Sequence, residues 1–183
     1  MISLHITESL KHVLNQNNLT ESDYSPAYGG ESAGLDLYTT QTITVPGISI
    51  DTYRVPLNND TYDHNHDIWP HSRTLIPTGL KVAIPRTHVG LIQERGSISK
   101  TPLKLRAGVI DSGYSGEIFI NVVSVREDFT LQAGEKTPFQ IIFVPICNTY
   151  KLVDENEFNE IHSSSQRQSG MIGSSDTKLP ASK

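Results

Sequence analysis

The sequence has very few cysteines: Cys147 is the single one among 183 residues. It cannot form a disulfide within the chain, and its apolar neighbours predict a buried side chain inside a strand and a reducing, intracellular setting. No run of residues is long and apolar enough to cross a membrane. Residues 1–7 are too few and too polar for a signal peptide. We therefore expect a cytoplasmic protein, or a host-cytoplasmic one if a virus or phage encodes it.

The sequence also lacks a block of positive charge. It has 15 Lys and Arg against 20 Asp and Glu, which gives a formal net charge of −5. General nucleic-acid binding depends on neutralising many phosphates, so this composition argues against a nucleic-acid partner. A single nucleotide remains possible, because it needs only a few placed donors.

Helical periodicity is scarce as well. Residues 2–6 alternate and predict a strand, and residues 7–15 predict a short helix that begins at Thr7. Elsewhere, short apolar stretches alternate with turn residues, which is typical of an all-β barrel or jelly roll. We expect one β-barrel domain over residues 1–150. The polar, Ser-rich residues 151–183 predict a flexible C-terminal arm.

The most informative stretch is residues 107–118, Ala-Gly-Val-Ile-Asp-Ser-Gly-Tyr-Ser-Gly-Glu-Ile. β-branched residues favour a strand at its start, two Ser-Gly pairs predict turns, and an apolar run continues to Val125. The pattern predicts a β-hairpin with Asp111 and Tyr114 at its tip. An acid beside an aromatic suits a pocket for a small ring-bearing substrate, and an ordinary surface turn is the alternative.

This stretch resembles the third motif of the trimeric dUTPase family, Gly-Val-Ile-Asp-x-x-Tyr-x-Gly-Glu-Ile. Counterparts of the other four motifs occur in order between residues 32 and 176. They are Ala33–Leu37 for Ala-Gly-x-Asp-Leu, Arg95–Ser97 for Pro-Arg-Ser-Gly or Pro-Arg-Ser-Ser, Gly134–Ile146 for Gly-x-x-x-x-Gln with an apolar run, and Arg167–Ser175 for the Gly-rich fifth motif. Five motifs in order make coincidence a poor explanation.

Two motifs depart from the family. In the second, Gly96 stands where a phosphate-contacting Ser is expected, and we predict that Ser97 takes over this role. In the fifth, Ile172 replaces the aromatic residue that covers the uracil. Stacking on an aromatic ring contributes roughly 1–3 kcal/mol, so we expect weaker substrate affinity or a looser lid, and the same reaction.

The resemblance implies a distorted jelly roll or β-barrel and a homotrimer with sites between subunits. It implies Mg²⁺-assisted hydrolysis of dUTP to dUMP and diphosphate, which limits uracil in DNA and supplies dUMP for dTTP synthesis. Asp111 is the implied general base, and Asp36 an indirect magnesium ligand through water. The implied substrate-binding residues are Arg95, Gly96, Ser97, Ala107, Gly108, Val109, Ile110, Tyr114, Gln140, Arg167, Ile172, Gly173 and Ser174.

Residues 51–73 replace a connection that is short in the family, and the sequence leaves their role open. His64, His66 and His71, beside Asp63 and Asp67, could bind a metal. Tyr53, Tyr62 and Trp69 favour contact with a protein partner. The alternative function is therefore a weakly active or inactive dUTPase-fold protein that regulates a partner through this insertion. A related deaminase is a further rival, but it needs a Glu where this chain has Asn121.

Overall fold

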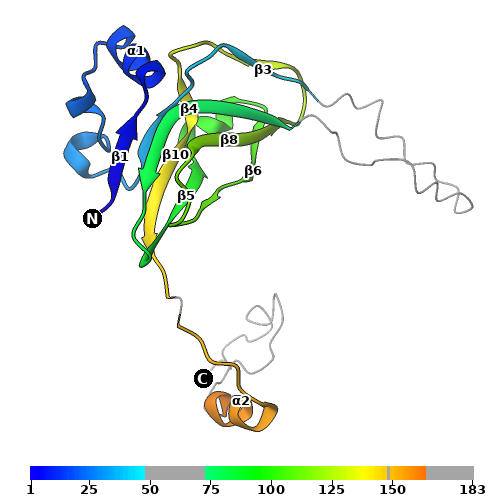
Figure 1. The fold of residues 1–183 in the computed structure, drawn as a ribbon. Coiled ribbons are helices and arrows are strands. Elements are labelled where there is room, and N and C mark those ends of the chain that lie inside the picture. Colours follow the sequence, from blue (N-terminus) through cyan, green and yellow to red (C-terminus); the bar gives the residue numbers. More distant parts are fainter. Residues whose placement is uncertain (48–72, 148, 164–183) are drawn as a thin grey trace, which may run out of the picture. The chain divides into compact units, whose positions relative to one another are not determined.

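The computed structural model describes residues 1–47, 73–147 and 149–163. The chain divides into two units, Met1–Ile146 and Cys147–Lys183, each described by itself. Strands dominate the first unit (Figure 1). No helix in the described parts of the chain is long and apolar enough to span a membrane.

The elements of the first unit form two four-stranded sheets and one two-stranded sheet. The sheet orders are β1-β4-β8-β6, β2-β10-β5-β7 and β3-β9. In chain order the elements are β1 (Ser3–Ile6), α1 (Glu8–Gln16), η1 (Glu21–Asp23), η2 (Tyr28–Gly30), β2 (Leu35–Tyr38), β3 (Ile43–Val45), β4 (Thr74–Ala83), β5 (His88–Glu94), η4 (Gly96–Lys100), β6 (Leu103–Ala107), β7 (Val109–Ile110), β8 (Glu117–Ser124), β9 (Phe129–Leu131) and β10 (Lys136–Pro145). The predicted all-β, jelly-roll class is confirmed, with sheets that do not close into a barrel.

The core joins the inner faces of the two large sheets. Alternation along β8 places Ile118, Ile120 and Val122 inside, while Phe119 between them is exposed. The core residues of the second sheet include Leu35, Leu37, Ile92, Phe139 and Ile141. In Figure 1, β4 and β8 lie side by side, as their antiparallel pairing requires.

The predicted N-terminal helix is confirmed as α1. The side chain of its N-cap residue, Thr7, accepts a hydrogen bond from the backbone N–H of Leu10 at 3.4 Å. Leu10, Val13 and Leu14 are buried in the core. These residues lie on one face at helical spacing, so α1 covers β4 with its apolar side.

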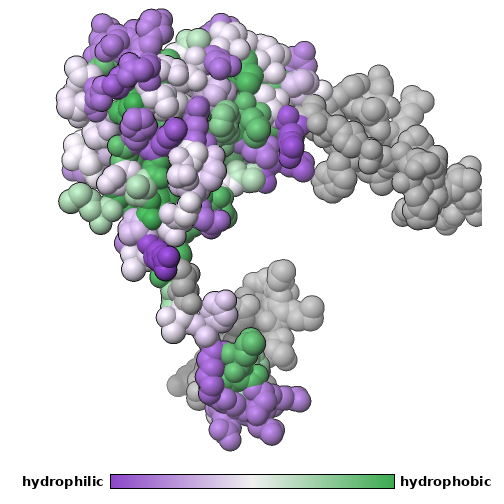
Figure 2. All heavy atoms as spheres, viewed as in Figure 1, coloured by the Kyte–Doolittle hydropathy of each residue, from purple (hydrophilic) through white to green (hydrophobic). Residues whose placement is uncertain are grey.

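One local prediction, the burial of Cys147, is wrong. Cys147 is exposed, because β10 ends at Pro145 and the apolar run ends with the strand. A helix, α2 (Glu155–His162), forms within the predicted arm. Asp154 starts α2 by accepting a hydrogen bond from Glu157 N–H at 2.9 Å, a cap that is visible in the sequence. Figure 2 shows an apolar patch on α2.

The predicted hairpin over residues 107–118 is also wrong in its pairing. The strands β7 and β8 form as expected, but β7 pairs with β5 in one sheet and β8 pairs with β4 and β6 in the other. The chain crosses from β6 in the first sheet to β7 in the second at Gly108. The carbonyl oxygen of Gly108 accepts a hydrogen bond from Ile92 N–H at 2.7 Å. A Cβ atom at Gly108 would lie 2.7 Å from the carbonyl oxygen of Ile92, so only glycine allows this approach.

Candidate active site

Strand register brings three of the predicted site residues together. Gln140 on β10 lies opposite Asp36 on β2 and, on its other side, opposite Gln93 on β5. Arg95 follows the last residue of β5. Three residues from distant parts of the sequence therefore form one cluster, called here the phosphate end: Asp36, Arg95 and Gln140.

Arg95 is held in a fixed orientation. Its Nε lies 2.7 Å from Oδ1 of Asp36, and its Nη1 donates to the carbonyl oxygen of Thr137 at 2.9 Å. Its backbone N–H donates to Pro138 O at 2.9 Å. The guanidinium is about one quarter exposed (26%) and keeps further N–H groups for an anion. A guanidinium group held in one orientation is well suited to donate paired hydrogen bonds to phosphate oxygens.

Asp36 contacts a second cation. Nζ of Lys136 lies 3.1 Å from Oδ2 of Asp36 and 5.5 Å from the centroid of the Tyr38 ring. Sequence reasoning did not single out Lys136, whose place in the cluster depends on strand pairing. Two cations surround one carboxylate, so these three charges sum to a positive value, which favours a polyanionic ligand.

Gln140 packs against the start of β2. Its Nε2 donates to the backbone carbonyl oxygen of Glu94 at 3.4 Å. A Cβ at Gly34 would collide with Oε1 of Gln140. Gly34 therefore leaves the room in which the Gln140 amide lies beside Asp36.

The fourth motif is one residue longer here than the family spacing. Five residues separate Gly134 from Gln140, where the motif has four. The pairing of β10 with β2 shifts register between Lys136 and Gln140, so a bulge takes up the extra length. Thr137 lies within this bulge, fully buried, and donates to Leu37 O at 2.7 Å.

The second motif forms a short helix. Gly96 and Ser97 begin η4 and are both exposed. A Cβ at Gly96 would meet no atom within 4 Å, so the backbone does not require glycine there. The role of Ser97 in place of the missing Ser stays a prediction.

The segment from Ala107 to Tyr114 is called here the base end, after the uracil base that the resemblance assigns to it. Its strand β7 pairs with β5. Val109 pairs with Leu91, and Ile110 pairs with Gly90 on β5. Asp111 is exposed, and its carbonyl oxygen accepts a hydrogen bond from Tyr114 N–H at 3.0 Å. The Tyr114 hydroxyl donates to Glu117 O at 2.6 Å, which fixes the ring.

Asp111 is separated from Arg95 along β5, whereas Gly108 bonds to Ile92, three residues before Arg95. Ile110 lies opposite Gly90, and Arg95 follows five residues later. At about 3.3 Å per residue, this distance is roughly 16 Å. One chain therefore does not bring Asp111 beside Arg95.

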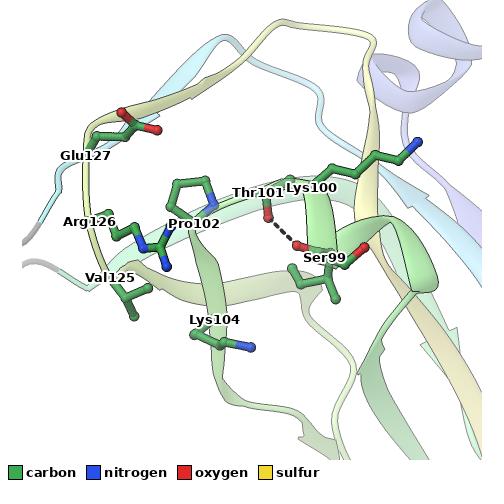
Figure 3. A pocket seen from close by; sticks show the side chains of 9 residues that line it. Ser99, Lys100, Thr101, Pro102, Lys104, Val125, Arg126 and Glu127 are labelled. Atoms are coloured by element: carbon green, nitrogen blue, oxygen red, sulfur yellow. Dashed lines mark hydrogen bonds between the residues drawn. The ribbon is translucent and has the colours of Figure 1, made fainter.

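The described part of the first unit also contains a shallow cavity of about 390 Å³ (Figure 3). It is lined by residues 98–102, Lys104 and residues 125–127, and Thr101 Oγ1 donates to Ile98 O at 3.0 Å beside it. None of the predicted site residues lines it. The remaining predicted residues, Arg167, Ile172, Gly173 and Ser174, and most of the insertion lie outside the described residues.

Comparison with known proteins identifies the class. The model of the dUTPase family matches residues 60–176. The deoxyuridine 5'-triphosphate nucleotidohydrolase of Escherichia phage T5 is 30% identical over 165 residues, 87% of this chain and 97% of the relative. The corresponding enzyme of Mycolicibacterium gilvum is 29% identical over 74% of this chain and 75% of its own.

Solved structures agree on the fold. The dUTPase of Staphylococcus bacteriophage 80alpha, as a mutant with dUpNHpp, has a TM-score of 0.67 at 19% identity and covers 96% of this chain and 98% of its own. A native EIAV dUTPase has a TM-score of 0.56 at 22% identity, over 85% of this chain and 98% of its own. The family model and these relatives define the class, the deoxyuridine triphosphate nucleotidohydrolases. This chain belongs to the dUTPase family. By family it is a dUTP diphosphatase, so the predicted family, fold and enzyme class are confirmed.

Proposed function

We propose that this chain hydrolyses dUTP to dUMP and diphosphate, with Asp111 as the general base. Asp111 takes a proton from a water molecule, the water oxygen bonds to the α-phosphorus, and the bond from that phosphorus to the bridging oxygen breaks. Diphosphate leaves with the electron pair of that bond. The observation that carries this proposal is the division of the family motifs into a positively charged phosphate end and a base end with an exposed carboxylate.

The phosphate end neutralises the charge that builds up on the leaving group. Arg95 donates its free N–H groups, with its orientation fixed by Asp36 and Thr137. Gln140 adds an amide beside it, and Ser97 adds a hydroxyl from η4. Donors held in place before the reaction contribute most to such a transition state, since no reorganisation is needed.

The base end selects the nucleoside. The backbone of Ala107 to Ile110 reads the uracil edge, so a 5-methyl or a 4-amino group fits less well. The Tyr114 ring, held by its hydroxyl on Glu117 O, lies against the deoxyribose and leaves no room for a 2′-hydroxyl. Arg167, Ile172, Gly173 and Ser174 of the fifth motif complete the site as a lid over the nucleotide.

The active unit is a homotrimer with its sites between subunits. The separation of roughly 16 Å between Ile110 and Arg95 supports this assembly, because a neighbouring subunit can bring its Asp111 to the phosphate end. Leu75 and Phe119 also leave apolar surface on the outer face of the first sheet, with exposures of 47% and 41%. Subunit contacts would cover such surface.

Mg²⁺ is the proposed cofactor, and the residues fit it in an indirect role. Among the described residues, no group of three or more His, Cys, Asp or Glu could hold a metal ion. Both carboxylate oxygens of Asp36 already face cations. Magnesium usually keeps several waters, so phosphates and waters would be its main ligands, and Asp36 would hold it only indirectly, through water. When bound, the ion neutralises phosphate charge.

The described residues offer no observation that favours the alternative, a regulatory protein acting through the insertion. The reaction is tested by measuring diphosphate release with Mg²⁺ from dUTP, UTP, dTTP and dCTP. We expect release from dUTP alone. Asp111→Asn should lower kcat by about 10²–10⁴-fold and keep the affinity for dUTP. Glu127→Gln is the control. It changes an exposed carboxylate that belongs to neither the phosphate end nor the base end, so it should keep full turnover. Unchanged turnover in Asp111→Asn would overturn the mechanism.

A further inference from the structure

Glu94, the last residue of β5, connects two strands that belong to different sheets. Its Oε1 accepts a hydrogen bond from the backbone N–H of Leu105 on β6 at 3.3 Å. β6 is the last strand of the first sheet, in the order β1-β4-β8-β6, whereas β5 belongs to the second sheet. On the side away from β8, no described strand pairs with β6. The Glu94 carboxylate therefore acts as the hydrogen-bond partner that a neighbouring strand would otherwise provide.

This hydrogen bond is the main contact of the Glu94 side chain. Oε2 of Glu94 also lies 3.8 Å from Nζ of Lys104, but the lysine side chain is 58% exposed. An exposed ion pair at this distance contributes little, because water screens it. The Glu94 side chain is only 31% exposed, so its contact with the Leu105 backbone is better shielded.

A second hydrogen bond joins the same two segments. Ile92 N–H donates to Gly108 O at 2.7 Å, just after the end of β6. Ile92 and Glu94 are two residues apart in one strand, so their side chains point to the same side of β5. The residues from Leu105 to Gly108, which lead into the base end, are thus fastened to β5 at both of their ends.

The backbone of Glu94 belongs to the surroundings of the phosphate end. Its carbonyl oxygen accepts from Nε2 of Gln140 at 3.4 Å, and Arg95 is the next residue in the chain. One residue therefore contacts the phosphate end with its main chain and the strand that leads into the base end with its side chain. Glu94 is placed to fix the distance between the two.

Glu94 is also a departure from the family pattern. The second motif, Pro-Arg-Ser-Gly or Pro-Arg-Ser-Ser, has Pro before its Arg, and this chain has Glu94 before Arg95. The proline side chain has no hydrogen-bond acceptor, so it cannot make this contact. The hydrogen bond to Leu105 is therefore a feature of this chain and not of the motif.

We propose that Glu94 is a positioning residue that holds the base end against β5 through its hydrogen bond to Leu105 N–H. This inference rests on the proposed function, in which the backbone of Ala107 to Ile110 reads the uracil edge. Hydrogen bonds to a charged acceptor are stronger than neutral ones, so the carboxylate suits this role. A backbone that is already held loses less freedom when the base binds, and Glu94 raises affinity without touching the substrate.

The first test is Glu94→Ala, which removes the acceptor. We expect the KM for dUTP to rise about tenfold while kcat changes little, because the variant loosens base binding and leaves the reacting groups in place. Steady-state kinetics with Mg²⁺ measures both constants, and thermal unfolding measures the Tm. A wild-type KM, together with a lower Tm, would show that Glu94 is only structural and would overturn the proposal.

Two further variants identify the atom that matters. Glu94→Gln keeps Oε1 as an acceptor, so it should restore a KM close to that of the wild type. Lys104→Met removes the ion pair and keeps the hydrogen bond, so it should also have the wild-type KM. A KM as high in Glu94→Gln as in Glu94→Ala would overturn the hydrogen bond as the cause.

Binding measurements separate this proposal from the reaction. Calorimetry compares dUMP, which carries the base, with inorganic diphosphate, which does not. Glu94→Ala should bind dUMP about tenfold more weakly and diphosphate as the wild type does. Equal weakening of both ligands would indicate general loosening and would overturn the proposal. If the wild-type chain released no diphosphate from dUTP, the proposed function would fail, and the dUMP comparison would still decide this inference.

Amide hydrogen exchange measures the contact without any ligand. The Leu105 N–H should exchange faster in Glu94→Ala than in the wild type, and Glu94→Gln should restore its protection. Equal exchange at Leu105 in all three proteins would show that the carboxylate does not hold β6, and would overturn the proposal.

Discussion

The side chain of Arg95 forms a direct ion pair with Asp36, with Nε of Arg95 2.7 Å from Oδ1 of Asp36. Both side chains are largely buried, with exposures of 26% and 17%, so the pair is shielded from water. The carboxylate thus fixes the direction in which the guanidinium presents its remaining donors. In this structure Asp36 acts first as the support of Arg95.

Asp36→Asn should weaken binding of the triphosphate. The amide keeps the shape but loses the charge that orients Arg95, so we expect kcat/KM for dUTP to fall by about tenfold or more. Steady-state kinetics with Mg²⁺ measures this. Lys136→Met removes only the more exposed partner of Asp36 and should have the smaller effect. Equal effects of the two variants would contradict the supporting role.

We predict that the serine of the second motif can act from either of two neighbouring positions, 96 or 97. Ser97→Ala should lower kcat/KM by about tenfold, because a phosphate loses a hydroxyl donor. Gly96→Ser added to this variant should restore most of the loss, since a Cβ at Gly96 meets no atom within 4 Å. Gly96→Ala in the same background is the control and should restore nothing. Wild-type kinetics in Ser97→Ala would show that this hydroxyl takes no part.

Gly108→Ala should damage both folding and base recognition. The new methyl group would lie 2.7 Å from Ile92 O and would disrupt the 2.7 Å hydrogen bond from Ile92 N–H to Gly108 O. We expect the free energy of unfolding to fall by about 1–3 kcal/mol, measured by urea denaturation, and the KM for dUTP to rise. Gly113→Ala is a matched control, because a Cβ there meets no atom within 4 Å. Equal stability of the two variants would contradict this account.

Tyr24 should make the protein sensitive to alkali. Its hydroxyl donates to Asp36 O at 2.9 Å, and burial raises its pKa above the ordinary value of 10.0. Above pH 10 the unfolded chain loses this proton while the folded chain keeps it. Stability is therefore complete below pH 10 and falls as pH rises, by about 1.4 kcal/mol per pH unit from this group. Tyr24→Phe should reduce this slope in urea denaturation at pH 9 to 11, and an identical slope would exclude Tyr24 as its source.

Local features explain what could be predicted from the sequence. Alternation and β-branched residues identified β1 and the strand of Ile118 and Ile120, because these patterns depend on neighbours in the chain. Thr7 marked the start of α1 for the same reason. The motif residues Asp36, Arg95 and Gln140 were also found, since their types and order are written in the sequence.

Pairing explains what could not be predicted. Val109–Ile110 and the strand after Glu117 were both expected, yet no local pattern shows that they belong to different sheets. Cys147 has apolar neighbours, but its exposure depends on where the pairing of β10 ends. The buried Oδ1 of Asn121, which has no hydrogen-bond partner among the described residues, likewise appears only once β4 and β6 pair with β8.

The sequence by itself determined the family and the all-β class, and it singled out Asp111 as the proposed general base, because residue types and their order carry this information. Only the tertiary structure decided that Asp36 supports Arg95, that Lys136 joins them, and that Ile110 and Arg95 lie roughly 16 Å apart along β5. The physical reason is that contacts between distant segments depend on strand register. A shift of one residue would turn each of these side chains to the opposite face of its sheet.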